Sequence, residues 1–153
     1  MNVHERGFDY ALEPLLRRRR WQLESAQARL GSATRKVAEA LEAVERREAR
    51  LLLEHAQASA ALSLRLDPAK HRNSLQWLSQ LREEIVAARA EHAALVSRRE
   101  AAAAECRKSQ VALEVVEKHR ADTLAEHAKT REGQLAAAAD ADWLGRSGWR
   151  QAQ

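Results

Sequence analysis

The sequence predicts an all-α protein in which two long helices form an antiparallel coiled-coil hairpin. The composition is the first reason: charged residues make up 31% of the 153 residues, and there are only two prolines and five glycines. Such a composition is typical of long helices and coiled coils. The second reason is an apolar residue at every seventh position in the first half, and the third is one clear turn signal near the middle. We expect a single domain over residues 1–153.

Helix one is predicted over about residues 10–66. Its seam residues, at heptad position a, are Leu16, Leu23, Leu30, Val37, Val44, Leu51 and Ala58. Position d, three residues after each, holds Arg19, Ala26, Ala33, Ala40, Arg47, Glu54 and Ala61. Alanine at most d positions allows a partner helix to approach closely, but it buries little apolar surface. The seam is therefore expected to be thin and only modestly stable.

A turn is predicted over residues 67–73. Asp67 is a favourable helix N-cap and Pro68 suits the first helical position, although Asn73 or Ser74 offers a second cap. Helix two therefore begins at Pro68 or near Leu75, and we place it over about residues 74–142, followed by a frayed tail over 143–153. Folding the chain at this turn brings Leu16 near Leu124.

Helix two has a seam of its own, with alternating spacings of three and four. It comprises Leu78, Leu81, Ile85, Ala88, His92, Leu95, Arg99, Ala102, Cys106, Ser109, Leu113 and Val116. Two successive spacings of four then lead to Arg120 and Leu124, which is a stutter. The stripe resumes as Ala128, Arg131, Leu135 and Ala138.

Catalytic and metal-binding motifs are missing from the sequence. There is no glycine-rich phosphate loop, no GxSxG and no HExxH. His119 and His127 share one helix face, but no carboxylate or thiol completes a metal site there. Cys106, the single cysteine, falls on the seam and is expected to be a buried, unreactive thiol. We expect a protein that is not an enzyme and that has no cofactor and no metal.

Hydropathy and cysteine content indicate the cellular compartment of the protein. No run of about 18 apolar residues suggests a transmembrane span, and the start "MNVHERGFDY" has no apolar signal-peptide region. A single cysteine fits a reducing compartment. The sequence predicts a cytosolic protein without direct membrane insertion.

Four consecutive arginines, Arg17 to Arg20, are followed by Trp21. Successive helical residues are separated by about 100°, so the four side chains sweep roughly 300° and encircle the helix as a basic collar. Glu13 and Glu24, each four residues from an arginine, partly neutralise it. A collar suits a surface that surrounds the helices, whereas a groove or a bilayer would touch one side only.

The four tryptophans are difficult to bury in so thin a hairpin. Trp77, next to the turn, and Trp21, on the flank of the seam, are candidate partner anchors, because tryptophan is enriched at interface hot spots. The alternative is that each packs lengthwise against the neighbouring helix. Trp143 and Trp149, in the tail, receive no role.

The opening "FDYALEPLLRRRRWQLESAQARL" resembles the N-terminus of the FliJ/YscO/SctO family of type III secretion stalk proteins. The residues that carry the likeness are Phe8, Tyr10, Leu12, Leu15, Leu16 and the arginines. The ending "REGQLAAAADADWLGR" is similar to the acidic, alanine-rich end of that family. Length and hairpin layout agree over nearly the whole chain.

This resemblance implies a non-enzymatic stalk that inserts into the hexameric type III secretion ATPase and reaches toward the export-gate protein. It also implies contacts with secretion chaperones and a cytoplasmic position, peripheral to the inner-membrane secretion apparatus. Carried over to this sequence, the residues facing the ATPase ring are Leu12, Leu16, Arg17, Arg18, Arg19, Arg20 and Trp21. Those facing the gate are Leu75, Trp77, Leu78 and Leu81. The arginine-rich sequence favours an injectisome, a virulence system, over a flagellar system.

Two other classes of protein compete with the stalk. A sequence pI of about 9.7 and the run "RRRRW" suit a nucleic-acid-associated basic coiled coil. The charges alternate in sign along the chain, which argues against that class, so we expect no nucleic-acid partner. A holdase-type chaperone would need an apolar hairpin tip, whereas the tip here, "DPAKHRN", is polar.

Overall fold

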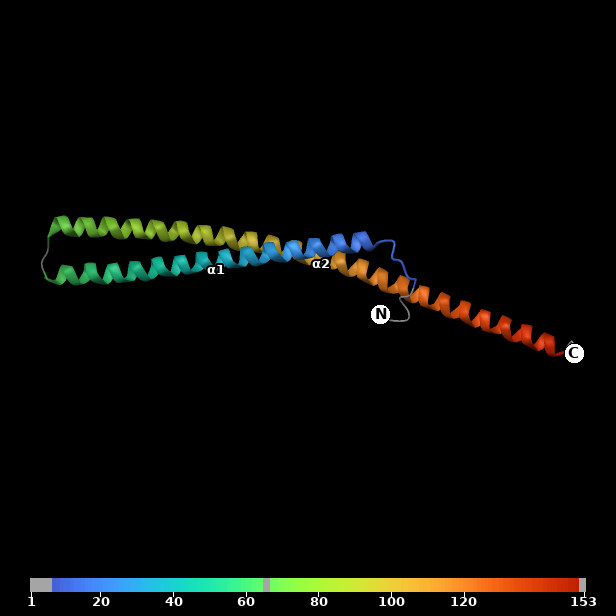
Figure 1. Ribbon diagram of the computed structural model, residues 1–153. Helices are drawn as coiled ribbons and strands as arrows, with labels where there is room; N and C mark the ends of the chain where they lie inside the picture. Colours follow the sequence, from blue (N-terminus) through green and yellow to red (C-terminus); the bar gives the residue numbers. More distant parts are fainter. Residues whose placement is uncertain (1–6, 65–66, 152–153) are drawn as a thin grey trace. The chain divides into compact units, whose positions relative to one another are not determined.

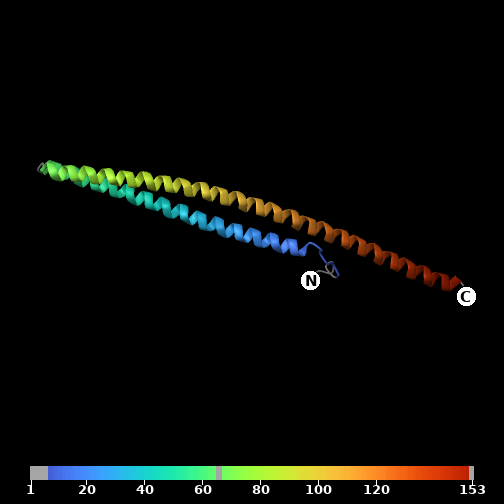
Figure 2. The same cartoon turned by 90° about the horizontal axis from the view of Figure 1, so that it is seen from above.

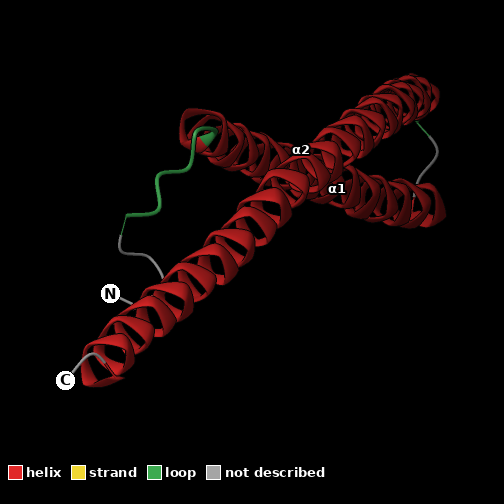
Figure 3. Cartoon of the chain, turned by 90° about the vertical axis from the view of Figure 1, so that its right-hand side faces the viewer, coloured by secondary structure: helices red, strands yellow, loops and turns green. Residues whose placement is uncertain are grey.

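The computed structural model describes residues 7–64 and 67–151, with the backbone alone for residues 62–64, 145 and 147–151. Two helices, α1 (Glu13–Leu64) and α2 (Pro68–Gln151), account for nearly all of the described chain (Figure 1). The described residues contain no strand, and residues 7–12, directly before α1, form a loop (Figure 3). The two helices pack against each other, so the predicted all-α helical hairpin is confirmed.

Helix α1 begins at Glu13, three residues later than predicted. The carbonyl of Tyr10 accepts a hydrogen bond from the Glu13 amide at 2.9 Å, and the carbonyl of Leu12 accepts one from Leu16 at 3.0 Å. Pro14 lies in the first turn, where a missing N–H leaves no intrahelical bond unmade. Residues 65 and 66, which the prediction assigned to the end of this helix, lie outside the described residues.

Helix α2 begins at Pro68, so the predicted seven-residue turn and the start at residue 74 are wrong, and the earlier of the two caps is used. The Asp67 carboxylate accepts a hydrogen bond from the Ala69 amide at 3.0 Å, as an N-cap does. The predicted end at 142 and the frayed tail are also wrong for the backbone, which stays helical to Gln151. A glycine costs about 1 kcal/mol in a helix, which is too little to end one within a run of strong helix formers.

The chain divides into two compact units. We call the first the terminal unit; it combines the residues up to Leu23 with those from Ser109 onward. The second, the turn unit, is Glu24–Lys108 and contains the connection between the helices. Figures 1 and 2 both show the end of α1 and the start of α2 side by side at this connection.

Helices α1 and α2 run antiparallel within each unit. In the terminal unit, Glu13 lies 3.9 Å from Arg120, and Arg20 lies 3.2 Å from Glu117, so partner numbers fall along α2 as they rise along α1. In the turn unit, Arg89 Nε donates to Glu48 at 2.9 Å, while α1 residues nearer the connection face Trp77 and Leu78.

The predicted seams form the core. Among the residues whose side chains are described, all buried hydrophobic ones except Tyr10 occupy seam positions; they are Leu16, Ala26, Val44, Leu78, Leu81, Ile85, Ala88, Leu113 and Val116. In the terminal unit the last seam members, Arg131, Leu135 and Ala138, are exposed. They lie beyond Arg120, which pairs with the first residue of α1, so none of the described turns of α1 reaches them.

The register differs from the prediction in the terminal unit. Leu16 packs in a cluster with Leu113 and Val116 instead of near Leu124. The physical reason is the shorter connection. Because α2 begins at Pro68, the point about which the chain folds lies closer to the N-terminus, and each α1 residue meets an earlier residue of α2.

Candidate functional site

An aromatic clasp, which we define as Phe8 and Tyr10, fastens the loop before α1 onto α2. Tyr10 is only 6% exposed, and its hydroxyl donates to the Val116 carbonyl at 3.3 Å and lies 2.9 Å from His119 Nδ1. The ring of Phe8 meets His127 edge-on, with centroids 5.5 Å apart. The clasp therefore closes the apolar cluster of the terminal unit.

The Tyr10 hydroxyl has one proton and two neighbours able to accept it, the Val116 carbonyl and His119 Nδ1. Thr123 Oγ1 donates to the His119 carbonyl at 2.7 Å and lies 3.5 Å from His119 Nδ1. With the Tyr10 proton directed at Val116, both hydroxyl oxygens present lone pairs to the ring nitrogen. All of these contacts are satisfied together when His119 carries a proton on Nδ1.

The basic collar keeps three of its four arginines exposed: Arg17, Arg18 and Arg20. Arg17 pairs with Glu13 at 3.4 Å, as predicted, but Arg20 pairs with Glu117 of α2 instead of with Glu24. Glu117 can reach Arg20 because the packing of α2 brings it alongside α1.

Arg19, the fourth collar residue, lies on the seam and is half-buried. Its Nη1 donates to Gln22 at 3.0 Å, while its Nε is buried without a hydrogen-bond partner. The side chain therefore belongs to the helix interface, and its guanidinium end reaches the edge of that interface.

The apolar residues assigned to the ATPase ring divide by exposure. Leu12 and Trp21 are exposed, and Trp21 presents 67% of its surface, whereas Leu16 is only 1% exposed. Leu16 therefore holds the two helices together, and Leu12 and Trp21 are the members open to a partner.

The residues assigned to the export gate divide in the same way. Leu75 and Trp77 are exposed, while Leu78 and Leu81 are buried between the helices. On one side of Trp77, the Arg50 guanidinium from α1 lies 5.1 Å from the centre of its ring. It leaves 36% of its surface open, and its use as a partner anchor stays a prediction.

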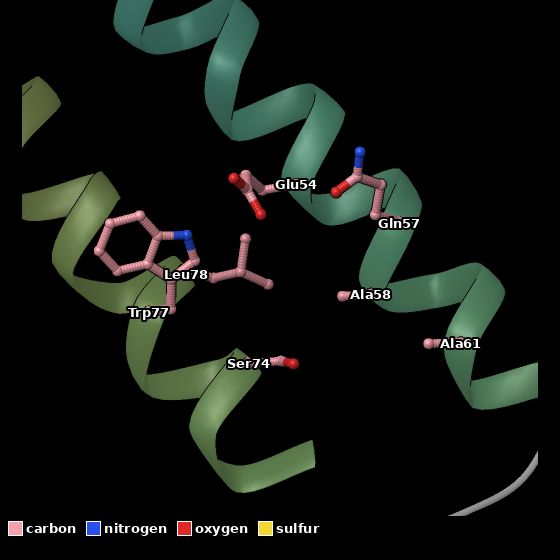
Figure 4. A pocket seen from close by; sticks show the side chains of 7 residues that line it. All are labelled: Glu54, Gln57, Ala58, Ala61, Ser74, Trp77 and Leu78. Atoms are coloured by element: carbon pink, nitrogen blue, oxygen red, sulfur yellow. The ribbon is translucent and has the colours of Figure 1, made fainter. Parts of the chain in front are cut away.

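A hollow of about 210 Å³ opens beside Trp77 in the turn unit. Figure 4 shows Trp77, Leu78 and Ser74 on α2 facing Glu54, Ala58 and Ala61 on α1. The hollow exists because Ala58 and Ala61 occupy successive a and d positions and leave the space opposite Leu78 unfilled. We call it the Trp77 hollow.

A second hollow, of about 380 Å³, was not anticipated from the sequence. It lies on the opposite flank of the same two helices and is lined by Glu48, Leu51, Leu52, Arg82, Ile85, Val86 and Arg89. Leu52 and Val86 are 73% and 66% exposed. The sequence does contain a signal for this hollow. Leu52 and Val86 each directly follow a seam residue, and each is apolar at a position that faces solvent in a coiled coil. We call it the Leu52–Val86 patch.

Within the described residues, the pKa of Glu105 is lowered, first by a hydrogen bond from Lys108 at 2.8 Å and then by the charge of that lysine. Cys106 is half-buried on the seam and carries a free thiol.

Neither a metal-binding cluster nor a membrane-spanning helix is found in residues 7–64 and 67–151. No three His, Cys, Asp or Glu side chains there come close enough together to hold a metal ion. Neither helix contains, in that part, a stretch long and apolar enough to cross a bilayer.

Comparison with known proteins adds nothing to this geometry: no protein-family model, no curated protein and no solved structure matches the chain.

Proposed function

We propose that this chain is a non-enzymatic stalk or adaptor subunit of a type III secretion system. In this proposal it inserts into the hexameric export ATPase and links that ring to the export-gate protein and to secretion chaperones. It works in the cytoplasm, peripheral to the inner-membrane apparatus. The motivation is the resemblance of the N-terminal sequence to the FliJ/YscO/SctO family, together with a helical hairpin of the kind that family implies.

One observation supports the proposal most directly: Arg17, Arg18 and Arg20 point outward from a helix whose packing does not require them. Exposed ion pairs stabilise a fold by only about 0–1 kcal/mol each, so Glu13 and Glu117 do not explain four consecutive arginines. A ring of subunits around the collar would meet positive charge on every side. Leu12 and Trp21 supply exposed apolar surface beside it.

The gate-facing end is assigned to the turn unit. Leu75 and Trp77 are the exposed members of the predicted set, and the Leu52–Val86 patch adds apolar surface on the opposite flank. Isolated exposed leucines are common, but a patch of neighbouring apolar residues rimmed by charge is typical of a protein–protein contact. Leu78 and Leu81 support this end by holding the helices together.

Charge reversal of the collar tests the ring assignment. The variant Arg17→Glu/Arg18→Glu/Arg20→Glu should abolish the stimulation of ATP hydrolysis by the purified export ATPase, with an unchanged circular dichroism spectrum. Wild-type stimulation should also fall as salt rises, because rim charges mainly govern association rate. The matched control is Arg35→Glu/Arg98→Glu/Arg107→Glu, which makes the same change in net charge at exposed sites outside the collar.

Full stimulation by the collar variant would refute the ring assignment. If the variant instead lost DNA binding, with a steep salt dependence in the wild type and no effect on any ATPase, the nucleic-acid-associated coiled coil would replace the stalk. A pull-down with the export-gate protein tests the other end, where Leu75→Ala/Trp77→Ala should weaken capture without loss of helicity.

A further inference from the structure

The Trp77 hollow has a definite size and a definite chemistry. Its volume is about 210 Å³, which is many times the space that one water molecule needs. Ala58, Ala61 and Leu78 provide an apolar floor, and the hollow opens to solvent at the edge of the two helices.

The polar groups around this floor are suited to accept hydrogen bonds from a cation. Glu54 contributes a carboxylate, Gln57 an amide carbonyl and Ser74 a hydroxyl oxygen, and none of the lining residues is cationic. The face of the Trp77 indole carries the negative end of its quadrupole and attracts cations. An anion would be repelled by Glu54, and an apolar side chain would remove water from that carboxylate without replacing its hydrogen bonds.

Arg50 shows that a guanidinium fits these groups. Its Cζ lies 5.1 Å from the centre of the Trp77 ring, and its Nε lies 3.9 Å from Glu54 Oε1. Both contacts are long and solvent-exposed, so they are weak. Arg50 comes from one side along its own helix and does not line the hollow, which leaves the space itself open.

We propose that the Trp77 hollow binds an arginine side chain presented by a protein partner, in competition with Arg50. The incoming guanidinium lies against the indole and pairs with Glu54, while its methylenes cover Ala58 and Ala61. Arginine is preferred to lysine because its guanidinium is planar and weakly hydrated. It can therefore stack on an aromatic face and donate hydrogen bonds to a carboxylate that has lost water. That the partner is the export-gate protein rests on the proposed function; the preference for arginine does not.

Titration of the isolated full-length chain with small probes tests the proposal. The probes are N-acetyl-arginine amide, N-acetyl-leucine amide and N-acetyl-glutamate amide, followed by the indole N–H signal of Trp77 in ¹⁵N-labelled protein. The arginine probe should shift this signal saturably, and the other two should not. Trp77→Phe assigns the signal, and equal shifts with the leucine probe would overturn the proposal.

Three variants sharpen the test. Arg50→Ala removes the competing guanidinium and should tighten binding of the arginine probe about two- to fivefold, since an exposed cation–π contact is weak. Glu54→Gln should weaken it by about the same factor or more. Ala58→Leu fills the space without a change of charge and should abolish the shift. Weaker binding by Arg50→Ala, or unchanged binding by Ala58→Leu, would show that the probe does not occupy the hollow.

These outcomes are separate from those of the stalk proposal, because no ATPase or gate protein takes part in the titration. If the chain binds arginine specifically but fails to stimulate any export ATPase, the hollow would still be an arginine-binding site. The export-gate protein would no longer be its proposed partner. If the chain stimulates the ATPase and binds the gate protein but shows no arginine-specific shift, the stalk proposal would stand. The proposal that the hollow binds arginine would be refuted.

Discussion

The terminal unit and the turn unit differ in how completely their described seam residues fill the space between the helices. In the terminal unit, Tyr10, Leu16, Leu113 and Val116 form a buried cluster, with Phe8, Leu15 and Leu23 packed against it. In the turn unit, hollows of about 210, 380 and 440 Å³ remain between or beside the helices. Alanine fills several of the seam positions that line them. The volume of the seam residues, more than their spacing, decides whether the interface is closed.

Truncation of the most buried leucines should give the largest difference in stability between the two units. Leu16 and Leu81 are each 1% exposed, one in each unit. Leu16→Ala should lower the free energy of unfolding by about 3–5 kcal/mol, because its closed cluster cannot collapse into the cavity. Leu81→Ala should cost about 2–3 kcal/mol, because the thin seam around it can relax. Urea unfolding followed by circular dichroism measures both.

Equal losses from the two leucine variants would mean that the two units pack alike. The contrast between a closed and an open seam would then be without energetic consequence. Val86→Ala, at an exposed position of the turn unit, is the control and should change the free energy of unfolding little.

The clasp should contribute the next largest difference. Tyr10→Phe keeps the ring but removes the hydroxyl from the Val116 carbonyl and from His119, and should cost about 1–2 kcal/mol. The ¹⁵N shifts of the His119 imidazole should show Nδ1 protonated in the wild type. A proton on Nε2, or no loss of stability in Tyr10→Phe, would contradict the hydrogen-bond arrangement at the clasp.

The sequence predicted those features that depend on periodicity. Both seams, from Leu16 on α1 and from Leu78 on α2, contain the buried residues, and Asp67 caps α2 as its side chain chemistry suggests. Local propensity and heptad spacing act within one helix and can be recognised without knowledge of its partner.

Features that depend on the pairing of the helices escaped prediction. The register of Leu16 depends on the length of the connection, and Asp67 and Asn73 or Ser74 were competing caps that only packing could choose between. Tyr10 precedes the first heptad, so its burial has no periodic signal. At the candidate site, Trp77 was proposed from its residue type and Leu75 from the family resemblance, whereas the Leu52–Val86 patch arises only when two helices place their neighbouring positions on one flank.

Filling an alanine position should make the turn unit resemble the terminal unit. Ala58→Leu places a large side chain in the Trp77 hollow opposite Leu78 and should raise the free energy of unfolding by about 0.5–1 kcal/mol. Ala56→Leu, at an exposed position of the same helix, is the matched control and should change it less. Thermal unfolding followed by circular dichroism measures the gain, and a loss of stability would indicate that the hollow is too shallow to accept the side chain.

The smallest expected effect concerns Glu105, at the far end of the turn unit from the connection. The pKa of its carboxyl is lowered by the hydrogen bond from Lys108, then by the charge of Lys108, with a further contribution from Arg29. Because the folded pKa lies below the unfolded one, this pair contributes stability above the ordinary glutamate pKa, and the contribution is lost as pH falls through the lower folded value. Lys108→Met should therefore raise the pKa of Glu105 toward its ordinary value, and Arg29→Met should raise it less. A ¹³C titration of the Glu105 carboxyl measures both shifts, and added salt should reduce them because the pair is fully exposed. An unchanged pKa in Lys108→Met would show that the two side chains do not remain paired in solution.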